Sequence, residues 1–435
     1  MDGAFFKTRS LSIRERLVMS SLALRKTALQ AKDTCQALSV LNSQQKEKAL
    51  LGMARAVLVG KMKILRANRA DVEEAKRKGL AASLVARLAL DEPGLRKIAR
   101  SVESIAKLPD PVGKTLWAKT RPNGLLIRKV SVPLGTILII YESRPNVTAD
   151  CMALCLKSGN SVILKGGSEA LKTNEALFQT MSRAAVKAGV PKGAFQLVRH
   201  NGRQAVKELL QMAGIIDLVI PRGGEGLIRE VAKISKIPVI KHYKGVCHIY
   251  VDKDADLKKA AKILLNAKTQ NPAVCNAAEC LLVHEKIAGR FLPKVGQDLL
   301  NARVEIRADQ KALPFMRGAK KATLKDWGRE YLELILAVRV VKDISGAIAH
   351  IERYGSRHSD AIITRNKASA RLFTNAVDSS AVFVNASTRF NDGGEFGMGA
   401  EMGISTDKLH ARGPMGLQEL TSYKYVVLGD GQTRG

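Results

Sequence analysis

The hydrophobic and polar positions of this chain fall into stretches with different periods. From about Leu11 to Lys107, leucine and alanine recur three or four residues apart between charged residues, which predicts a series of helices. Pro93-Gly94 lies inside this stretch and predicts a helix end between two helical segments. Between Thr115 and Val132, two short alternating runs flank Asn123-Gly124, which predicts a β-hairpin of the kind that often serves subunit assembly.

After Pro133 the pattern changes to short apolar runs separated by stretches of helical length. This spacing is typical of a parallel sheet covered by helices, a doubly wound domain. The predicted strands are Gly135–Tyr141, Ser161–Leu164, Phe195–Val198, Ile216–Ile220 and Pro238–Ile240. Because such sheets bind ligands at the carboxyl ends of their strands, the loops that follow three of these runs are candidate binding loops. They are 142–146, 165–168 and 221–224.

A second alternation extends from Val251 to about Val384. Helices are expected near Ala255–Asn266 and Lys286–Leu300, with a strand near Ala278–His284. The glycine-rich tail ends in a further strand-like run, Ser422–Leu428. With 435 residues, the chain is long enough for two or three domains.

The glycine-rich loops match neither common nucleotide fingerprint. Gly224-x-Gly226 is followed by Arg229 where the third glycine of a dinucleotide fingerprint should stand, and the chain has no P-loop. A doubly wound domain with glycine-rich strand ends still fits one common dinucleotide-binding variant.

Composition excludes several classes of protein. With 46% hydrophobic and 26% charged residues, the chain is neither disordered nor collagen-like. The longest apolar runs, such as Leu134–Tyr141, are too short to cross a membrane. Six scattered cysteines favour reduced thiols over a disulfide framework. The first thirty residues lack a clean cleavable pattern, so we expect a cytoplasmic location.

The net charge of +31 arises from 71 basic and 40 acidic residues, and most of the surplus lies in residues 1–250. Two interpretations remain open: a solvated helix surface, and attraction of a small polyanion. Nucleic-acid binding is less favoured because aromatic residues make up only 4% and no recognition motif occurs.

The cysteines provide one candidate nucleophile. Cys275 lies in a polar, proline-interrupted loop between a predicted helix and an apolar strand, where a thiol can be exposed and activated. A structural cysteine is the alternative, and Cys247 is a weaker second candidate. The pairs Cys151–Cys155 and Cys275–Cys280 lack zinc-ligand spacing and the seven histidines are dispersed, so no metal site is expected.

Four motifs carry a family resemblance. The chain resembles the gamma-glutamyl phosphate reductase family, within the aldehyde dehydrogenase superfamily, over about residues 35 to 428. The motifs are Tyr141–Thr148, Gln270–Asn276, the stretch from Val341 to Asp360, and His410–Leu417. Their consistent order makes the resemblance far more specific than any single glycine pattern.

The resemblance implies an α/β fold of aldehyde dehydrogenase type. A Rossmann-type NADPH-binding domain would comprise residues 1–112 and 133–249, and an α/β catalytic domain residues 250–385. A small oligomerisation element would combine the hairpin 113–132 with the tail 406–435, and residues 386–405 would return to the cofactor domain. A homo-oligomer is therefore expected.

The implied reaction is NADPH-dependent reduction of L-glutamyl 5-phosphate to L-glutamate 5-semialdehyde, with release of phosphate. Cys275 would form a thioester, and Asn146 would stabilise the oxyanion together with the Cys275 backbone N–H. The region 242–248 stands where acid-forming relatives carry a glutamate base, and it contains no carboxylate. That absence favours the reductase, because no water needs to be activated.

The remaining implied site residues are cofactor and substrate ligands. The cofactor would be bound by Lys165, Gly166, Ser168, Arg222, Gly223, Gly224 and Glu330; the substrate anions would be bound by Arg144, Arg389 and Arg412. Glutamate 5-kinase would be a separate chain and a possible partner, and neither nucleic acid nor membrane is expected to bind. The alternatives are an aldehyde dehydrogenase of another substrate class and a non-enzymatic, basic anion- or nucleic-acid-binding protein.

Overall fold

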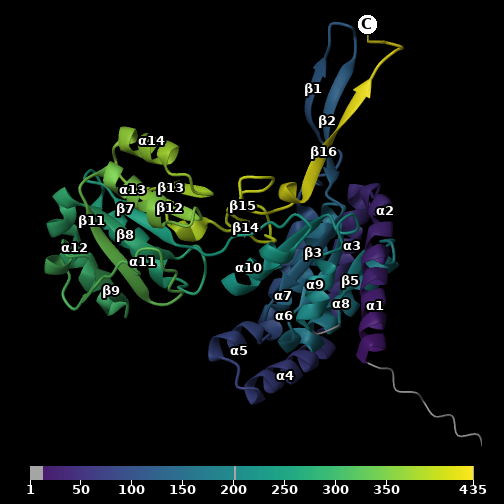
Figure 1. The fold of residues 1–435 in the computed structure, drawn as a ribbon, viewed down its shortest axis with the longest axis horizontal. Helices are drawn as coiled ribbons and strands as arrows, with labels where there is room; N and C mark the ends of the chain where they lie inside the picture. Colours follow the sequence, from purple (N-terminus) through teal and green to yellow (C-terminus); the bar gives the residue numbers. More distant parts are fainter. Residues whose placement is uncertain (1–12, 200–201, 435) are drawn as a thin grey trace, which may run out of the picture. The chain divides into compact units, whose positions relative to one another are not determined.

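The computed structural model describes residues 13–199 and 202–434, which form two compact units (Figure 1). Unit 1 comprises Met1–Ile240 and Gly416–Gly435, and unit 2 comprises Lys241–Met415. Residues 11 and 12, where the predicted helical stretch begins, lie outside the described residues.

From residue 13, where the described part of unit 1 begins, six helices follow one another, as the three- to four-residue periodicity predicts. They are α1 (Ile13–Asp33), α2 (Cys35–Ser39), α3 (Ser43–Val59), α4 (Lys61–Arg77), α5 (Ala82–Leu88) and α6 (Glu92–Lys107). The expectation that Pro93-Gly94 ends a helix is wrong, since both residues lie in the first turn of α6. Proline is tolerated there because its missing N–H would have no partner within the helix. Asp91 caps this turn by accepting a hydrogen bond from the Gly94 N–H at 2.7 Å.

A four-stranded parallel sheet forms the second part of unit 1, in the order β5-β4-β3-β6. The sequence pattern locates these strands, but Pro238–Ile240 forms only an isolated bridge between Val239 and Val219. The strand order reverses at β3, so the carboxyl ends of β3 and β6 flank the position where doubly wound domains bind ligands. The elements are β3 (Thr136–Tyr141), β4 (Ser161–Gly166), β5 (Phe195–Leu197), β6 (Leu218–Arg222), α7 (Pro145–Lys157), α8 (Leu171–Lys187), α9 (Arg203–Leu209), α10 (Glu225–Ile234) and a short 3₁₀ turn, Ser168–Ala170.

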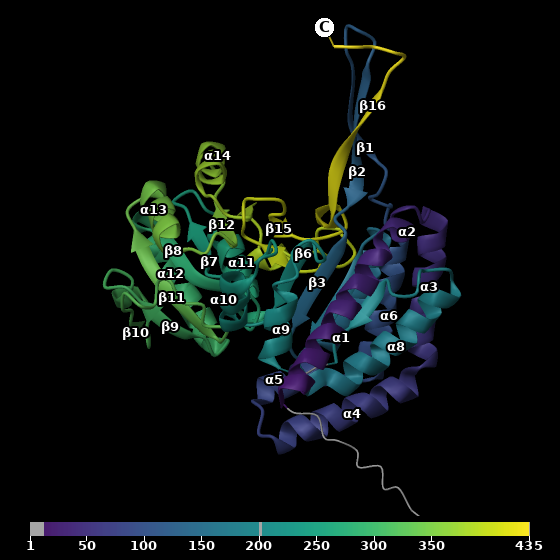
Figure 2. The ribbon, with the colours of Figure 1, turned by 45° about the vertical axis from the view of Figure 1, so that its right-hand side comes forward.

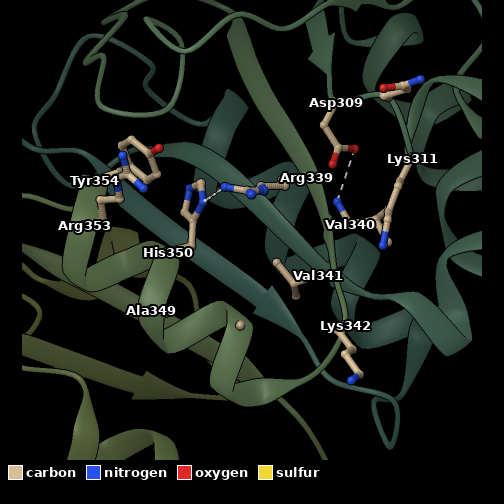
Figure 3. A pocket seen from close by; sticks show the side chains of 12 residues that line it. Asp309, Lys311, Arg339, Val340, Val341, Lys342, Ala349, His350, Arg353 and Tyr354 are labelled. Atoms are coloured by element: carbon tan, nitrogen blue, oxygen red, sulfur yellow. Dashed lines mark hydrogen bonds between the residues drawn. The ribbon is translucent and has the colours of Figure 1, made fainter.

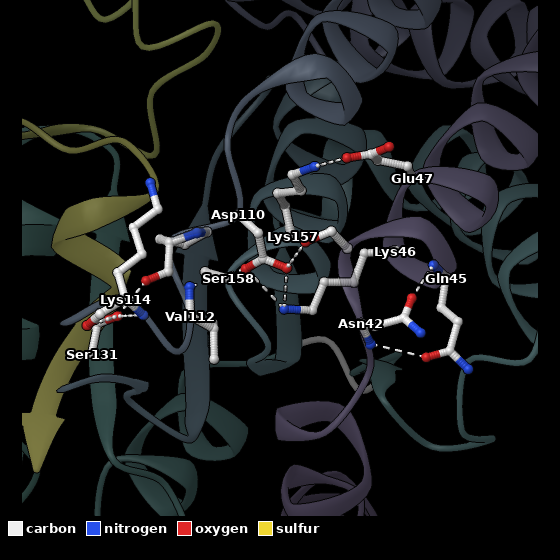
Figure 4. Close-up of polar contacts among 12 residues, drawn as sticks. Asn42, Gln45, Lys46, Glu47, Asp110, Val112, Lys114, Ser131, Lys157 and Ser158 are labelled. Atoms are coloured by element: carbon white, nitrogen blue, oxygen red, sulfur yellow. Dashed lines mark hydrogen bonds and ion pairs between the residues drawn. The ribbon is translucent and has the colours of Figure 1, made fainter. Parts of the chain in front are cut away.

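Two buried lysines tie the helices of unit 1 together (Figure 4). Lys46 on α3 donates to both carboxylate oxygens of Asp110, at 3.1 and 2.9 Å, and burial lowers its pKa. Lys157 at the end of α7 donates to Glu47 at 3.1 Å and to the Ala106 carbonyl at 2.7 Å. Buried charges persist only where they are paired, so these contacts fix α3 against the segment that leads into the hairpin.

The hairpin and the tail form one antiparallel sheet. Strand β1 (Thr115–Thr120) pairs with β2 (Leu126–Pro133), and β2 pairs along its whole length with β16 (Thr421–Leu428), which follows a 3₁₀ turn at Gln418–Leu420. The predicted hairpin and tail strand are therefore confirmed. The three strands lie side by side in both views and extend beyond the helices of unit 1 (Figures 1 and 2).

Unit 2 is built on a parallel sheet of seven strands, in the order β10-β9-β11-β8-β7-β12-β13. The expected strand Ala278–His284 is β8, and the two expected helices are α11 and α12. The strands are β7 (Cys247–Val251), β8 (Ala278–His284), β9 (Glu305–Ala308), β10 (Lys320–Lys321), β11 (Ile335–Val341), β12 (Ser359–Ile363) and β13 (Ala381–Val384). The helices are α11 (Leu257–Thr269), α12 (Glu285–Asn301), α13 (Ile344–Tyr354) and α14 (Lys367–Ala376), with 3₁₀ turns at Leu313–Phe315 and Thr388–Phe390. A small pair, β14 (Ile404–Ser405) and β15 (Gly413–Pro414), follows.

Both faces of the unit 2 sheet are buried, as is usual for parallel sheets. Along β8, Leu281 and Val283 join the core under α11 and α12, whereas Cys280 and Leu282 join the opposite core with residues of α13 and α14. The pleat of the strand therefore decides which core each side chain enters. Cys280 is a core cysteine.

The compact units divide the chain differently from the predicted functional domains. By compactness, unit 2 begins at Lys241 instead of residue 250, and it includes residues 386–405 and 406–415. The resemblance implies instead that residues 386–405 return to the cofactor domain and that residues 406–415 belong to the oligomerisation element. The two units are groups of residues in contact, whereas the predicted domains are defined by what they bind. The division into units therefore does not test the predicted roles, which remain predictions.

Candidate functional site

The loop that carries Cys275 connects the end of α11 to the start of β8. The Cys275 side chain is partly exposed, whereas Cys247 is fully buried at the start of β7. Burial raises the pKa of the Cys247 thiol well above its ordinary value. A nucleophile needs access and thiolate character, so Cys247 is disfavoured and Cys275 remains the candidate.

An ion pair fixes both ends of this loop. Lys268, at the end of α11, donates to the Glu279 carboxylate of β8 at 2.7 Å, and both side chains are buried. Glu279 also accepts a hydrogen bond from the Leu332 N–H at 3.1 Å. Burial raises the pKa of Glu279 to about 7, against the opposing effect of Lys268. The pair holds α11 and β8 together where the loop leaves one and enters the other.

The backbone of Cys275 is held from the segment before β7. The Cys247 thiol lies 3.2 Å from the Cys275 carbonyl oxygen. A β-carbon on Gly245 would lie 1.7 Å from the same oxygen, so only glycine fits at that position. The Gly245 N–H donates to the Glu330 carboxylate at 2.7 Å. Glu330, predicted to bind the cofactor, is therefore connected to Cys275, the candidate nucleophile, through a single glycine.

Two histidines lie beside the Cys275 thiol. One ring nitrogen each of His242 and His358 and the sulfur of Cys275 lie within 4.8 Å of one another. His242 Nδ1 lies 2.9 Å from the Ile404 carbonyl, which can only accept, so Nδ1 carries the proton and Nε2 the lone pair. His358 is fully buried, and burial lowers its pKa to about 4, so it is neutral at neutral pH.

Sequence reasoning did not select either histidine as a site residue. The available signal was that His242 begins the region 242–248, which the resemblance sets against the glutamate-base stretch of acid-forming relatives. His358 lies in the family-like stretch that ends at Asp360, but nothing in the spacing indicated that it approaches Cys275.

A second cluster with metal-ligand residue types is buried in the core of unit 2. Ligand atoms of His248, Cys280 and His350 lie within 4.8 Å of one another. However, His350 Nδ1 lies 2.8 Å from a guanidinium nitrogen of Arg339, which can only donate. Neutral His350 then carries its proton on Nε2, the nitrogen 3.7 Å from the Cys280 sulfur. The arrangement suits a hydrogen bond better than a metal ion.

Of the three predicted substrate arginines, Arg389 is the one that contacts the Cys275 loop. Its guanidinium donates to the side chains of Gln270, at 2.8 Å, and Asn276, which stand on either side of Cys275. A cavity of about 240 Å³ opens next to Arg389 and Gln270. Arg412 instead donates to the Asp378 carboxylate and carbonyl, both at 2.8 Å. These contacts give Arg412 a structural role within unit 2.

In unit 1, two glutamates connect the loops after β3, β4 and β6. Glu169 accepts hydrogen bonds from the backbone N–H and the hydroxyl of Ser143, at 2.7 and 2.8 Å. Glu142 accepts one from the Gly224 N–H at 3.1 Å. The predicted cofactor loops therefore meet at the switch point of the sheet. Glu142 belongs to the predicted binding loop 142–146 but was not selected as a site residue, and Glu169, which follows the predicted Ser168, was not predicted.

These strand ends have features that suit a dinucleotide. Lys165 is buried at the end of β4, and its ammonium donates to the Gly166 carbonyl at 2.8 Å. Within residues 13–199 and 202–434, no carboxylate lies within ion-pair distance of it, and burial lowers its pKa. Ser168 is exposed and begins the 3₁₀ turn after β4. Arg222 ends β6, and Gly223 and Gly224 lead into α10, whose amino terminus suits a phosphate.

The predicted oxyanion residue lies at the start of α7. Asn146 is exposed, and its amide donates to Asp150 one helical turn later, at 3.1 Å. Asp150 also accepts a hydrogen bond from Ser101 at 2.8 Å. Arg144 precedes this helix and Pro145 begins it. Because Asn146 belongs to unit 1 and Cys275 to unit 2, their cooperation remains a prediction.

Comparison with known proteins gives one consistent result. Residues 29–328 match the aldehyde dehydrogenase family model. Gamma-glutamyl phosphate reductase of Caldanaerobacter subterraneus is 51% identical over 407 residues, covering 94% of this chain and 98% of that protein. The corresponding enzyme of Carboxydothermus hydrogenoformans is 52% identical over 408 residues, covering 94% and 98%.

Solved structures agree with the sequence relatives. The crystal structure of gamma-glutamyl phosphate reductase from Thermotoga maritima is 45% identical, with a TM-score of 0.93, and covers 95% of this chain and 100% of that one. An acetylating aldehyde dehydrogenase from Geobacillus thermoglucosidasius, 19% identical with a TM-score of 0.69, covers 97% of this chain and 100% of its own and shares the fold. The predicted aldehyde dehydrogenase-type fold is confirmed, and the chain belongs to the gamma-glutamyl phosphate reductase family within the aldehyde dehydrogenase family.

Proposed function

We propose that this protein catalyses the NADPH-dependent reduction of L-glutamyl 5-phosphate to L-glutamate 5-semialdehyde, with release of phosphate. This is the second step from glutamate towards proline. The observation that carries the proposal is the partly exposed Cys275 thiol beside two histidine rings, in a chain about half identical to proteins named gamma-glutamyl phosphate reductase. A reductase of acyl phosphates needs a nucleophile at such a position.

In the first chemical step, Cys275 sulfur bonds to the acyl carbon and the carbon–oxygen bond to phosphate breaks. His242 Nε2 takes the thiol proton, because Nδ1 is already committed to the Ile404 carbonyl. The Cys275 backbone N–H would stabilise the oxyanion that develops on the carbonyl, and the Asn146 amide is the proposed second donor. When the aldehyde leaves, the carbon–sulfur bond breaks and the thiolate is restored.

When bound, NADPH would supply a hydride for reduction of the thioester. In this chain, Lys165, Gly166 and Ser168 would bind the adenosine ribose side. Arg222, Gly223 and Gly224 would line the adenine and phosphate region. Glu330 would bind the nicotinamide ribose, next to the Gly245 backbone that it already contacts. Preference for NADPH over NADH belongs to this proposal.

The substrate carries a phosphate and an α-carboxylate, and guanidinium groups suit both. Arg389 is the best-supported candidate because it contacts the residues that flank Cys275. Arg144, before α7, is a second candidate. Arg412 is the weakest candidate of the three because its guanidinium already forms an ion pair with Asp378.

The decisive experiment runs the reaction in reverse, since the acyl phosphate is labile. Purified protein is mixed with glutamate semialdehyde, NADP and phosphate, and formation of NADPH is followed by absorbance. We expect NADPH formation that depends on phosphate. Cys275→Ala should abolish it while NADPH binding persists. Cys35→Ala is the matched control, because Cys35 is the other cysteine with a partly exposed side chain.

The other outcomes would each identify a different protein. Cofactor reduction without phosphate would indicate an acid-forming aldehyde dehydrogenase. Retained turnover in Cys275→Ala would remove the thioester from the mechanism. An inactive, folded protein that binds DNA or RNA tightly at high salt would indicate a binding protein on the same fold.

We also propose a homo-oligomer in the cytoplasm, with assembly through the three-stranded sheet of unit 1. All six cysteines are free, which agrees with a reducing compartment. In the described parts of the chain, no helix is both long and apolar enough to span a membrane. A separate glutamate 5-kinase would supply the acyl phosphate, and direct transfer between the two enzymes would protect it from hydrolysis.

A further inference from the structure

A cavity of about 410 Å³ lies at the carboxyl ends of β9 and β11, next to α13 (Figure 3). Four basic side chains line it: Lys311 after β9, Arg339 on β11, Lys342 after β11 and Arg353 on α13. The cavity lies entirely within unit 2. None of the residues that line it has a role in the proposed reaction.

The cavity is separate from the candidate nucleophile. Val341, which lines it, pairs with His284 at the carboxyl end of β8, whereas Cys275 precedes the amino end of that strand. A strand of this length spans about 20 Å. The cavity and the thiol therefore lie at opposite edges of the same sheet.

Arg339 is held in place without being neutralised. Its guanidinium donates to His350 Nδ1 at 2.8 Å and lies over the Trp327 ring, 5.5 Å from the ring centre. Figure 3 shows the Arg339 side chain directed at His350. His350 is buried, and burial, His248 and Arg339 together lower its pKa to about 2, so it is a neutral acceptor. His350 therefore does not cancel the guanidinium charge, and Asp309 is a carboxylate near enough to attract it electrostatically.

The other charges around the cavity do not balance this one. Among the residues that the structure describes, no carboxylate lies within ion-pair distance of any of the four cations. Asp309 is the one acidic residue of the lining, and its Oδ1 accepts hydrogen bonds from the backbone N–H groups of Ala312, at 2.8 Å, and Val340, at 3.4 Å. Arg339 is partly buried, whereas Lys311, Lys342 and Arg353 are exposed to solvent. Four cations against one carboxylate leave room for an anion.

We propose that this cavity binds a small anion that carries phosphate groups. Guanidinium and ammonium groups together are the usual ligands of phosphate, and several cations favour a multivalent anion over a single carboxylate. The cavity is larger than inorganic phosphate needs, so a phosphate ester or a polyphosphate fits as well. Ligands of open α/β sheets commonly bind at this edge of the sheet.

The test titrates the full-length protein with inorganic phosphate, pyrophosphate and ATP, by calorimetry and by hydrogen exchange read by mass spectrometry. At least one probe should bind and protect the amides of residues 309–312 and 340–354. Arg339→Gln and Lys311→Gln should each weaken that binding about tenfold. Lys294→Gln, on the exposed side of α12, removes the same charge elsewhere in unit 2 and should leave the affinity unchanged.

Each outcome decides the proposal. Binding of inorganic phosphate would identify free phosphate as a sufficient ligand, whereas binding of pyrophosphate or ATP alone would require linked phosphates. Protection confined to other segments, equal affinities in all variants, or no binding of any probe would overturn the site. Lys311 is exposed, so its variant keeps the test valid even if Arg339→Gln does not fold.

Discussion

The geometry around Cys275 at the scale of single residues leads to a prediction for His242. Replacing His242 with Gln removes the lone pair that we propose takes the thiol proton, while a side-chain N–H can still donate to the Ile404 carbonyl. We expect kcat/KM at neutral pH to fall about 100-fold, at the lower end of general-base effects. The loss should shrink at alkaline pH, because hydroxide can then form the thiolate.

The measurement is the pH profile of the reverse reaction in the wild type and in His242→Gln. A purely structural role for His242 would lower activity by the same factor at every pH. It would also change the thermal midpoint, so both are recorded. An unchanged profile with full activity would exclude His242 as the base.

His358 leads to a second prediction at this scale, on stability. Burial lowers its pKa from 6.5 to about 4, although Glu330, Asp360 and Glu401 act in the opposite direction. Between these values the unfolded chain binds a proton that the folded chain does not, so stability is lost as the pH falls through this window. The loss amounts to about 3 kcal/mol for this one group.

Urea unfolding at pH 7.5 and pH 4.5 tests this prediction. His358→Gln should be less stable than the wild type at pH 7.5 but should lose less stability on acidification. His350 is also buried with a lowered pKa, so some pH dependence will remain. Equal losses in both proteins would show that His358 does not control the acid sensitivity.

At the scale of elements, the sequence pattern located most strands and helices because their periods were regular. Two expectations failed where one local signal has two structural uses. Proline and glycine occur near both ends of helices, and here Pro93-Gly94 lies in the first turn of α6. The run Pro238–Ile240 is apolar enough for a strand but makes only one bridge with β6. The run does not form a strand because of its position in the fold, not because of its composition.

In the candidate site, too, residues within continuous motifs could be predicted, whereas residues brought together only by the fold could not. Cys275, Glu330 and the loops after β3, β4 and β6 could be selected from motifs, because each motif is continuous in the chain. The approach of His358 to Cys275 could not, since it depends on β12 and the loop before β8 meeting across the sheet of unit 2. The same holds for Gly245, whose need for glycine becomes clear only beside the Cys275 carbonyl.

At the scale of the whole molecule, the sheet formed by β1, β2 and β16 carries the assembly prediction. Every residue of β1 is exposed, and Trp117, Tyr425 and Val427 expose 46%, 59% and 53% of their surface. Large apolar side chains on a thin sheet are unfavourable in water unless another surface covers them. A second copy of the same sheet is the partner that homo-oligomers commonly use.

The double variant Trp117→Glu, Tyr425→Glu should therefore shift the protein towards the monomer mass of 47.2 kDa in analytical ultracentrifugation. Charges placed in an apolar interface oppose association through their desolvation, whereas β1 and β2 keep their backbone pairing within each chain. Leu324→Glu is the control, since Leu324 is 79% exposed in unit 2, outside this sheet. A wild type that sediments as a monomer, or a double variant with the wild-type mass, would contradict assembly through the sheet. If the monomeric variant keeps its activity, the sheet serves assembly alone; if activity is lost with the oligomer, the site depends on assembly.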